Sequence, residues 1–214
     1  MNYNYNKMEV AAMDLNCSKF YYNDLTNLIV KEIKLSLLKG DKCHEGYVSW
    51  PYSYKLDSDA QIVHWVYSVF RSKKPRTDRW DIHAWSGVNE YSEPSIELAF
   101  LLKKGIWTKK NGIDLPELSN VVAHELHHLT QFEDYCEKKP ENLASYEYFL
   151  LPCEKEAFHI GFRAQSNISG KSIEQCMLDY LKPRKKTGDL TQQQVNKVVD
   201  AWLNVEWKLS HNSK

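Results

Sequence analysis

Residues 121–131 read Val-Val-Ala-His-Glu-Leu-His-His-Leu-Thr-Gln, in a chain of 214 residues. Within this stretch His124 and His128 are four positions apart, so on a helix they lie one turn above each other on the same face. The apolar residues recur at helical spacing, and we expect them to face the core: Val122, Leu126 and Leu129. The stretch therefore predicts an amphipathic helix that carries two neighbouring histidines.

The two histidines have the spacing needed to bind one metal ion. Imidazole nitrogens bind Zn²⁺ at about 2.0–2.1 Å, and a catalytic zinc site keeps one position open for water. Glu125 lies about 100° around the helix from His124, so we expect it to reach that water and not the metal. Zinc lowers the pKa of the water toward about 7, and a carboxylate beside it accepts the proton as the water attacks a carbonyl. The pattern His124-Glu125-x-x-His128 therefore predicts a zinc-dependent hydrolase with Glu125 as its catalytic base.

A catalytic zinc also needs a third protein ligand. Residues 151–161 read Leu-Pro-Cys-Glu-Lys-Glu-Ala-Phe-His-Ile-Gly, and Pro152 suits the start of a second helix. The candidate ligands near that start are Glu154, Glu156 and His159. Because the two glutamates are two positions apart, they point to different faces of a helix and only one of them can be the ligand.

Together these two segments resemble the gluzincin class of zinc metallopeptidases, especially small bacterial and phage-type members with a Pro-x-Glu-x-Glu-Ala segment. The similarity covers about 118–165. It implies a zincin-like fold and the hydrolysis of a peptide or protein substrate. The third ligand in gluzincins is usually a glutamate three residues before a small residue, which corresponds here to Glu154 with Ala157, and Glu156 is the second choice. The implied zinc ligands are His124, His128 and Glu154.

One position departs from the better-known gluzincins. An aspartate often stands four residues after the ligand glutamate and orients one of the histidines, but here that position is Phe158. We therefore expect the group that fixes a histidine tautomer to be Glu156, His159 or a backbone carbonyl. Side chains that flank the third ligand are candidates to donate a hydrogen bond to an oxyanion: Tyr146, Tyr148, His159 and Arg163.

The resemblance also implies where a substrate docks. Zincin folds usually place an antiparallel edge strand before the active helix, and an extended peptide pairs with that strand. By its order in the chain, a strand at about 95–101 is the candidate for this edge.

A second functional hypothesis keeps the zincin scaffold without turnover. In this hypothesis the chain is a binding or structural component, for example of a phage particle or a toxin-like complex. The absence of an aspartate at position 158 favours it.

Hydrophobic periodicity predicts the helices of the chain. Asp114 and Pro116 mark the start of the histidine-bearing helix, and Thr191 with Gln194 forms the pattern of a capping box. Helical spacing and stop signals predict helices over about 19–39, 58–72, 116–137, 152–166, 171–182 and 192–210.

The remaining segments complete an α+β pattern. Alternating polar and apolar residues predict strands at about 80–85 and 96–100, and residues 40–56 are expected to form a loop. The order of helices, strands and helices predicts a mostly helical zincin-like fold with a small mixed or antiparallel sheet beside the active-site helix. We expect a single domain over residues 1–214, with a loose arm at 1–17 and a helical C-terminal part at 167–214.

Composition limits the partners of the chain. Lys+Arg and Asp+Glu both total 28, and a net charge of zero is not typical of a nucleic-acid-binding protein. The N-terminus does not resemble a secretory signal, and no apolar run approaches the about 18 residues that a membrane span needs. We therefore expect no nucleic-acid or membrane partner and a cytoplasmic location, or packaging in a virion. The oligomeric state and the substrate's identity stay open.

Overall fold

The computed structural model describes residues 18–49, 62–72, 80–91, 93–103, 114–131 and 144–205. These residues form an α+β fold, which confirms the predicted class. In chain order the elements are α1 (Ser18–Lys39), β1 (Cys43–Ser49), β2 (Ile62–Ser72), β3 (Trp80–Val88), β4 (Pro94–Lys103), α2 (Leu115–His128), α3 (Ser145–Phe149), α4 (Pro152–Ser169), α5 (Ile173–Thr187) and α6 (Gln192–Leu203).

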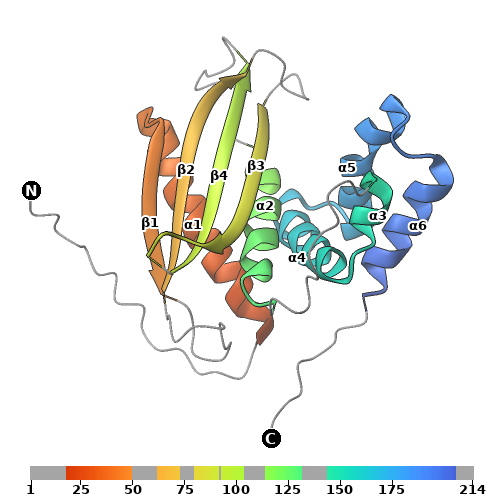
Figure 1. The fold of residues 1–214 in the computed structure, drawn as a ribbon, viewed down its shortest axis with the longest axis horizontal. Helices are drawn as coiled ribbons and strands as arrows, with labels where there is room; N and C mark the ends of the chain where they lie inside the picture. Colours follow the sequence, from red (N-terminus) through yellow and green to blue (C-terminus); the bar gives the residue numbers. More distant parts are fainter. Residues whose placement is uncertain are drawn as a thin grey trace, which may run out of the picture.

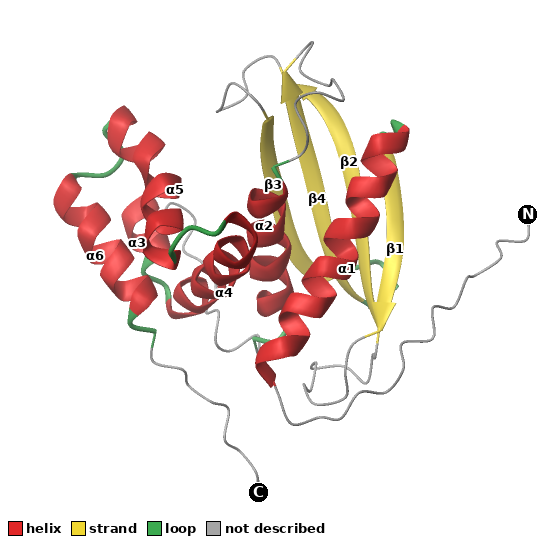
Figure 2. Ribbon diagram, turned by 180° about the vertical axis from the view of Figure 1, so that it is seen from behind, coloured by secondary structure: helices red, strands yellow, loops and turns green. Residues whose placement is uncertain are grey.

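The four strands form one mixed sheet in the order β1-β2-β4-β3. β2 and β4 are parallel, with Trp65 opposite Ile96, and the other two pairs are antiparallel. Helices α1 and α2 cover one face of this sheet (Figures 1 and 2). Because β4 lies inside the sheet, the prediction that the strand at 95–101 is an edge is wrong; β3 is the edge strand on that side.

A hydrophobic core fills the space between the sheet and helices α1 and α2. Burial of each large apolar side chain stabilises the fold by about 1.5–3 kcal/mol, so this core holds α2 firmly against the sheet. The apolar face of α2 contributes Val122 and Leu126, both fully buried, with Leu129 packed at the margin. The residues buried in this core are Leu25, Ile29, Val30, Ile33, Leu37, Val63, Trp65, Tyr67, Ile96, Leu98, Phe100, Leu118, Val122 and Leu126.

The helix predicted over 58–72 is wrong for residues 62–72, which form β2; residues 58–61 lie outside the described part of the chain. Val63, Trp65 and Tyr67 are buried and alternate with less buried residues, which is the period-two pattern of a strand. Ile62 and Phe70, which a helix over 58–72 would place on its apolar face, are 48% and 52% exposed. Enrichment in β-branched and aromatic residues is the signal that favoured a strand here.

The loop predicted over 40–56 is wrong for residues 43–49, which form β1. The side chains of β1 are mostly exposed, so its sequence has no apolar alternation to reveal a strand. Pairing with β2 supplies the backbone hydrogen bonds that define it. The part of this predicted loop from 50 to 56 lies outside the described residues.

Most helices agree with the sequence-based expectations, and their ends are set by local chemistry. Gly40 follows α1 with φ 91°, a conformation that favours glycine, and the capping box of Thr191 and Gln194 opens α6 as predicted. The histidine-bearing helix ends at His128, earlier than predicted, and 129–131 form a turn. The short α3 was not predicted, and α5 continues beyond 182 to Thr187.

The C-terminal helices have a second hydrophobic core of their own, formed by α3 to α6. Trp202 of α6 is fully buried in it and donates a hydrogen bond from Nε1 to the Phe149 carbonyl at 2.9 Å. Helix α4 lies beside α2 and connects the sheet side of the molecule to these helices (Figure 1). In the C-terminal part of the described chain, residues 173–187 and 192–203 are helical.

The described residues do not test the predicted N-terminal arm, the single domain or the cytoplasmic location. The arm predicted over residues 1–17 lies outside them. Among the described helices, none combines the length and apolar character needed to cross a bilayer. A single domain and a cytoplasmic location stay predictions.

Helices α2 and α4 approach each other closely where Gly161 meets Asn120. A Cβ atom built on Gly161 would lie 2.4 Å from the Asn120 side-chain oxygen and 2.8 Å from its backbone oxygen. Asn120 also donates a hydrogen bond to Gln165 at 2.7 Å. This contact fixes the separation of the two helices that carry the candidate metal ligands.

Gly161→Ala is expected to lower the free energy of unfolding by about 1–3 kcal/mol, because the backbone of α2 cannot move away freely. At a helix position with free space around it, the same change would stabilise the protein by roughly 0.5–1 kcal/mol. The sign of the change in unfolding free energy therefore shows whether Gly161 is tightly packed against α2. Chemical denaturation measures it. Gly87→Ala, where an added Cβ meets nothing within 4 Å, serves as the control and is expected to change stability little. A stabilised Gly161→Ala variant would contradict the close packing of α2 and α4.

Candidate metal centre

Helix α2 places His124 and His128 on one face. Asp114 caps the helix, accepting a hydrogen bond from the Glu117 backbone amide at 3.3 Å, and such a cap contributes about 1 kcal/mol. The regular helix then stacks the two imidazoles one turn apart, with their Nε2 atoms 3.0 Å from each other. Both rings are largely buried, so their nitrogen atoms converge on one enclosed point.

Helix α4 brings Glu154 to the same point. Pro152 occupies the first turn of α4 and Glu154 follows in that turn, with a side chain that is 0% exposed. Its Oε2 atom lies 3.4 Å from His124 Nε2 and 3.5 Å from His128 Nε2. Among the described residues, these three side chains are the group whose ligand atoms lie within 4.8 Å of one another.

These distances fit a tetrahedral zinc site. Two ligand atoms that each lie about 2.1 Å from a zinc ion, at a tetrahedral angle, are about 3.4 Å apart. The three measured separations are 3.0, 3.4 and 3.5 Å. Two imidazoles and one carboxylate are also a donor set of a catalytic zinc, with one coordination position left over. Without a metal, the same contacts form hydrogen-bonded ion pairs between Glu154 and the imidazoles.

The charges at this point are strongly coupled. Burial alone would raise the pKa of Glu154, but hydrogen bonds from His124 and His128 outweigh burial and hold it well below its usual range. Burial alone would lower the pKa of His128, but the hydrogen bond and charge of Glu154 outweigh it and raise this pKa above its ordinary value of 6.5. Glu154 is therefore a carboxylate at neutral pH, as a metal ligand must be.

Zinc affinity is expected to fall as the pH is lowered from 8 to 6. A histidine binds zinc only as the neutral imidazole. Because the pKa of His128 is raised, a proton competes for its ring nitrogen at a higher pH than for an ordinary histidine. Below that pKa, displacement of one proton costs about tenfold in affinity per pH unit. Competition with a chromophoric chelator at several pH values measures the effect. An affinity that stays constant over this range would contradict proton competition at the site.

Glu156, the second choice for third ligand, does not face this point. Its Oε2 atom lies 3.4 Å from His127 Nε2, and both side chains are 10% exposed. Burial lowers the pKa of His127 and outweighs the opposing hydrogen bond and charge of Glu156. The structure thus separates two neighbouring groups: Glu154 with His124 and His128, and Glu156 with His127.

Gln131 orients His128, a role that the sequence did not reveal. Its Oε1 atom lies 2.7 Å from His128 Nδ1. An amide oxygen only accepts, so Nδ1 carries the proton and the lone pair of neutral His128 lies on Nε2, toward Glu154. The Gln131 amide nitrogen donates to the Cys153 carbonyl at 2.9 Å and to Glu156 at 3.3 Å. The early end of α2 places Gln131 in the turn that makes these contacts possible.

An aromatic ring lies against His124 where the better-known gluzincins carry a carboxylate. The Phe158 ring meets the His124 ring nearly edge to face, with centroids 4.6 Å apart. On its other side Phe158 stacks on Trp202 at 4.4 Å, within the second core. His159, another candidate orienting group, contacts the Trp202 carbonyl through Nδ1 at 2.8 Å and belongs to that side of α4.

Glu125 is held by the edge strand of the sheet. The Ser86 hydroxyl of β3 donates a hydrogen bond to Glu125 Oε2 at 2.8 Å. Glu125 is 8% exposed, so this bond fixes a carboxylate that is mostly shielded from solvent. Ser86 was not singled out from the sequence, because nothing in a strand pattern tells which side chain reaches a neighbouring helix.

Tyr148 is a flanking tyrosine that interacts with Glu154. Burial, together with the charge and hydrogen bond of Glu154, raises the pKa of Tyr148 well above its ordinary value. Its hydroxyl therefore stays protonated and donates toward Glu154. Tyr146, a second candidate, packs against the second core.

Comparison with known proteins returns no relative for this chain. No protein-family model, no curated protein and no solved structure matches it. A functional proposal therefore depends on the chemistry and geometry of the candidate centre itself.

Proposed function

We propose that this chain is a zinc-dependent metallopeptidase of gluzincin type with a zincin-like fold. The observation that carries the proposal is the convergence of the His124, His128 and Glu154 ligand atoms within 4.8 Å of one another. Glu125, next to this point in sequence, is a buried carboxylate that a serine hydroxyl holds in place. A donor set of this kind with an adjacent carboxylate supports hydrolysis more than a structural role, because a closed structural site needs four protein ligands.

In the proposed reaction each side chain has a separate role. His124, His128 and Glu154 would hold Zn²⁺, which would act as a Lewis acid and lower the pKa of water toward about 7. Glu125 accepts a proton on a carboxylate oxygen and returns it to the leaving amine. Ser86 holds that carboxylate by its hydrogen bond, and Gln131 keeps the lone pair of neutral His128 on Nε2, the atom that would bind the metal.

Tyr148 supplies a hydrogen-bond donor in this proposal. Its raised pKa keeps the hydroxyl protonated at neutral pH, and its hydrogen bond with Glu154 places it beside the metal ligands. The hydroxyl has one proton to donate, so it would stabilise the negative charge that develops on the carbonyl oxygen when it turns from Glu154 to the substrate.

The substrate class follows from the sheet edge beside Glu125. Among the described residues β3 pairs with β4 alone, so its other edge offers backbone hydrogen-bonding groups. An extended peptide that pairs with this edge would lie next to Ser86, and therefore next to Glu125. We propose peptides in an extended conformation as the substrates.

A peptide library derived from a digested proteome tests the activity. The purified chain is loaded with zinc and incubated with the library, and new termini are identified by mass spectrometry. We expect cleavage that depends on zinc and stops when a chelator removes it. Cleavage that continues without bound metal would contradict the mechanism.

A zinc-holding protein without turnover is the second candidate. The Phe158 ring against His124, where the better-known gluzincins place a carboxylate, is the observation that favours it. Stoichiometric zinc together with no cleavage of the library would support this candidate over the peptidase.

A further inference from the structure

The edge strand β3 offers two different faces to a peptide that pairs with it. Side chains alternate along a strand, so Ser86 points toward α2, where it contacts Glu125, and Trp85 points to the opposite face of the sheet. Figures 1 and 2 show α1 and α2 on the face toward which Ser86 points. On the opposite face Trp85 is 49% exposed. A peptide on this edge therefore meets Trp85 as well as the candidate centre.

The hydrogen bonds between β3 and β4 show which backbone groups of β3 face its open edge. The Asn89 amide donates to the Glu93 carbonyl at 2.9 Å, and in an antiparallel pair hydrogen-bonded and non-hydrogen-bonded residue pairs alternate. The next pair is Val88 with Pro94, and proline has no N–H to donate. By this alternation Ser86 directs its backbone groups away from β4, toward the open edge.

This register brings a peptide side chain against Trp85. A peptide residue opposite Ser86 exchanges backbone hydrogen bonds with it, so the next peptide residue lies opposite Trp85 in a non-hydrogen-bonded pair. Side chains of such a pair lie on the same face, with Cβ atoms about 4.5–5.5 Å apart. Gly87, the next residue of β3 on that face, leaves space beside this position, because an added Cβ would meet nothing within 4 Å. A long peptide side chain can therefore lie along Trp85.

The neighbour of Trp85 across the sheet is acidic. Glu97 of β4 lies directly opposite Trp85 on the same face, and it is partly exposed. Within two positions of this pair on either strand, the face carries no Lys or Arg. The other residues there are His83, Gly87, Ser95 and Ala99. An exposed indole next to a carboxylate suits a cationic side chain, which is attracted to the ring face and to the negative charge.

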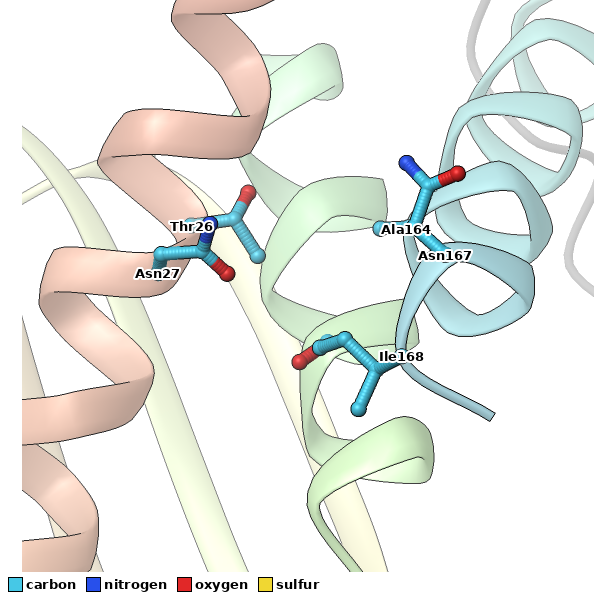
Figure 3. A pocket seen from close by; sticks show the side chains of 6 residues that line it. Thr26, Asn27, Ala164, Asn167 and Ile168 are labelled. Carbon is cyan, nitrogen blue, oxygen red and sulfur yellow. The ribbon is translucent and has the colours of Figure 1, made fainter. Parts of the chain in front are cut away.

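The hollow between α1, α2 and α4 does not offer this chemistry. It is lined by Thr26, Asn27, Ser119, Ala164, Asn167 and Ile168 (Figure 3). None of these residues is acidic, so a basic side chain would find no carboxylate there. None of them belongs to β3 or to the candidate metal centre.

We propose that Trp85 and Glu97 select peptide substrates with a basic residue at one fixed position within three residues of the cleaved bond. This inference rests on the proposed peptidase function. The position lies near that bond because Ser86, the neighbour of Trp85, holds the proposed base Glu125. The indole stacks on the Lys or Arg side chain, and Glu97 pairs with its charge. Together these contacts favour a basic side chain over alanine by about 3- to 30-fold.

Peptide binding to the full chain tests this inference without turnover. The ¹⁵N-labelled Glu125→Gln variant, supplied with zinc, is titrated with a capped octapeptide of threonine and alanine that carries Arg, Ala or Glu at its fifth position. NMR should show saturable shifts of β3 backbone amides. We expect the Arg peptide to bind about 3- to 30-fold more tightly than the Ala peptide, and the Glu peptide to bind most weakly. Equal affinities for the three peptides, or no saturable shift at β3, would overturn the inference.

Variants of the two residues identify the contact. Trp85→Thr and Glu97→Gln are each expected to reduce the preference for Arg over Ala by about two- to fivefold. Tyr47→Thr and Glu45→Gln make similar changes at exposed positions of β1, at the far edge of the sheet. These controls should leave the preference unchanged. The amide spectrum reports the folding of each variant, and a preference that persists in both folded test variants would contradict the assignment.

Cleavage sites in the peptide library separate this inference from the proposed function. The zinc-loaded parent is expected to cleave peptides with Lys or Arg enriched at one fixed position, and Trp85→Thr to cleave with a weaker enrichment. Zinc-dependent cleavage without such enrichment would overturn the inference and leave the peptidase proposal standing. Selective binding of the Arg peptide at β3 by a chain that cleaves nothing would overturn the peptidase proposal and leave a site for basic peptides on β3.

Discussion

Glu125→Gln is expected to reduce peptide hydrolysis by about 100- to 10,000-fold, the usual contribution of a general base, while the chain keeps its zinc. Glutamine has nearly the same shape and can still accept the hydrogen bond from Ser86, so the helix and the metal ligands should stay in place. It cannot accept a proton from water. Single-turnover cleavage rates and zinc content, measured on the same preparation, check both parts of this prediction.

Glu174→Gln makes the same chemical change at an exposed position of α5 and is the matched control. It is expected to leave both zinc content and rate unchanged. If Glu125→Gln cleaves peptides as fast as the parent, Glu125 is not the base. If the variant loses zinc as well as activity, the result would report a metal-site defect and a role in proton transfer would have no support.

The second large effect concerns the third ligand. Glu154→Ala is expected to weaken zinc binding more than 100-fold, because it removes one of the three converging ligand atoms. Glu156→Ala is expected to weaken it by about 10- to 100-fold at most, the usual effect of a residue that only supports a ligand. Glu156 acts at a distance, through the hydrogen bond that Gln131 donates to it. Chelator competition at pH 8 measures both affinities.

Replacement of a buried glutamate by alanine also changes packing, so each alanine variant needs a control variant whose side chain has the volume of glutamate. Glu154→Gln and Glu156→Gln keep the volume and remove the charge. The order of effects should be the same in this pair. A larger loss of zinc affinity at position 156 than at position 154 would contradict the assignment of Glu154.

The sequence predicted the local part of the candidate centre well. Four-residue spacing on a capped, amphipathic helix leaves little freedom for His124 and His128, and their stacked Nε2 atoms follow from helix geometry alone. Pro152 likewise marked the start of α4. These features depend on neighbours within a few positions of the chain.

Features that depend on distant contacts were not predictable in this way. Helical periodicity alone cannot tell whether Glu154 or Glu156 faces α2, because that depends on how α4 is rotated against it. Ser86 and Gln131 contact the centre through a strand edge and a turn after α2, and neither has a motif. The wrong prediction of a helix where β2 forms has the same cause. Ile62 and Phe70 are apolar and were expected in the core, but the pairing of β2 in the sheet places them on its exposed face.

The zinc content of the purified full chain tests the central claim most directly. Elemental analysis should be made on the parent and on His128→Ala, after zinc is supplied and the excess removed. We predict one zinc per chain in the parent and none in the variant, since His128 provides one of the three converging ligand atoms. A parent chain that binds no zinc under these conditions would contradict the metal centre and the peptidase proposal with it.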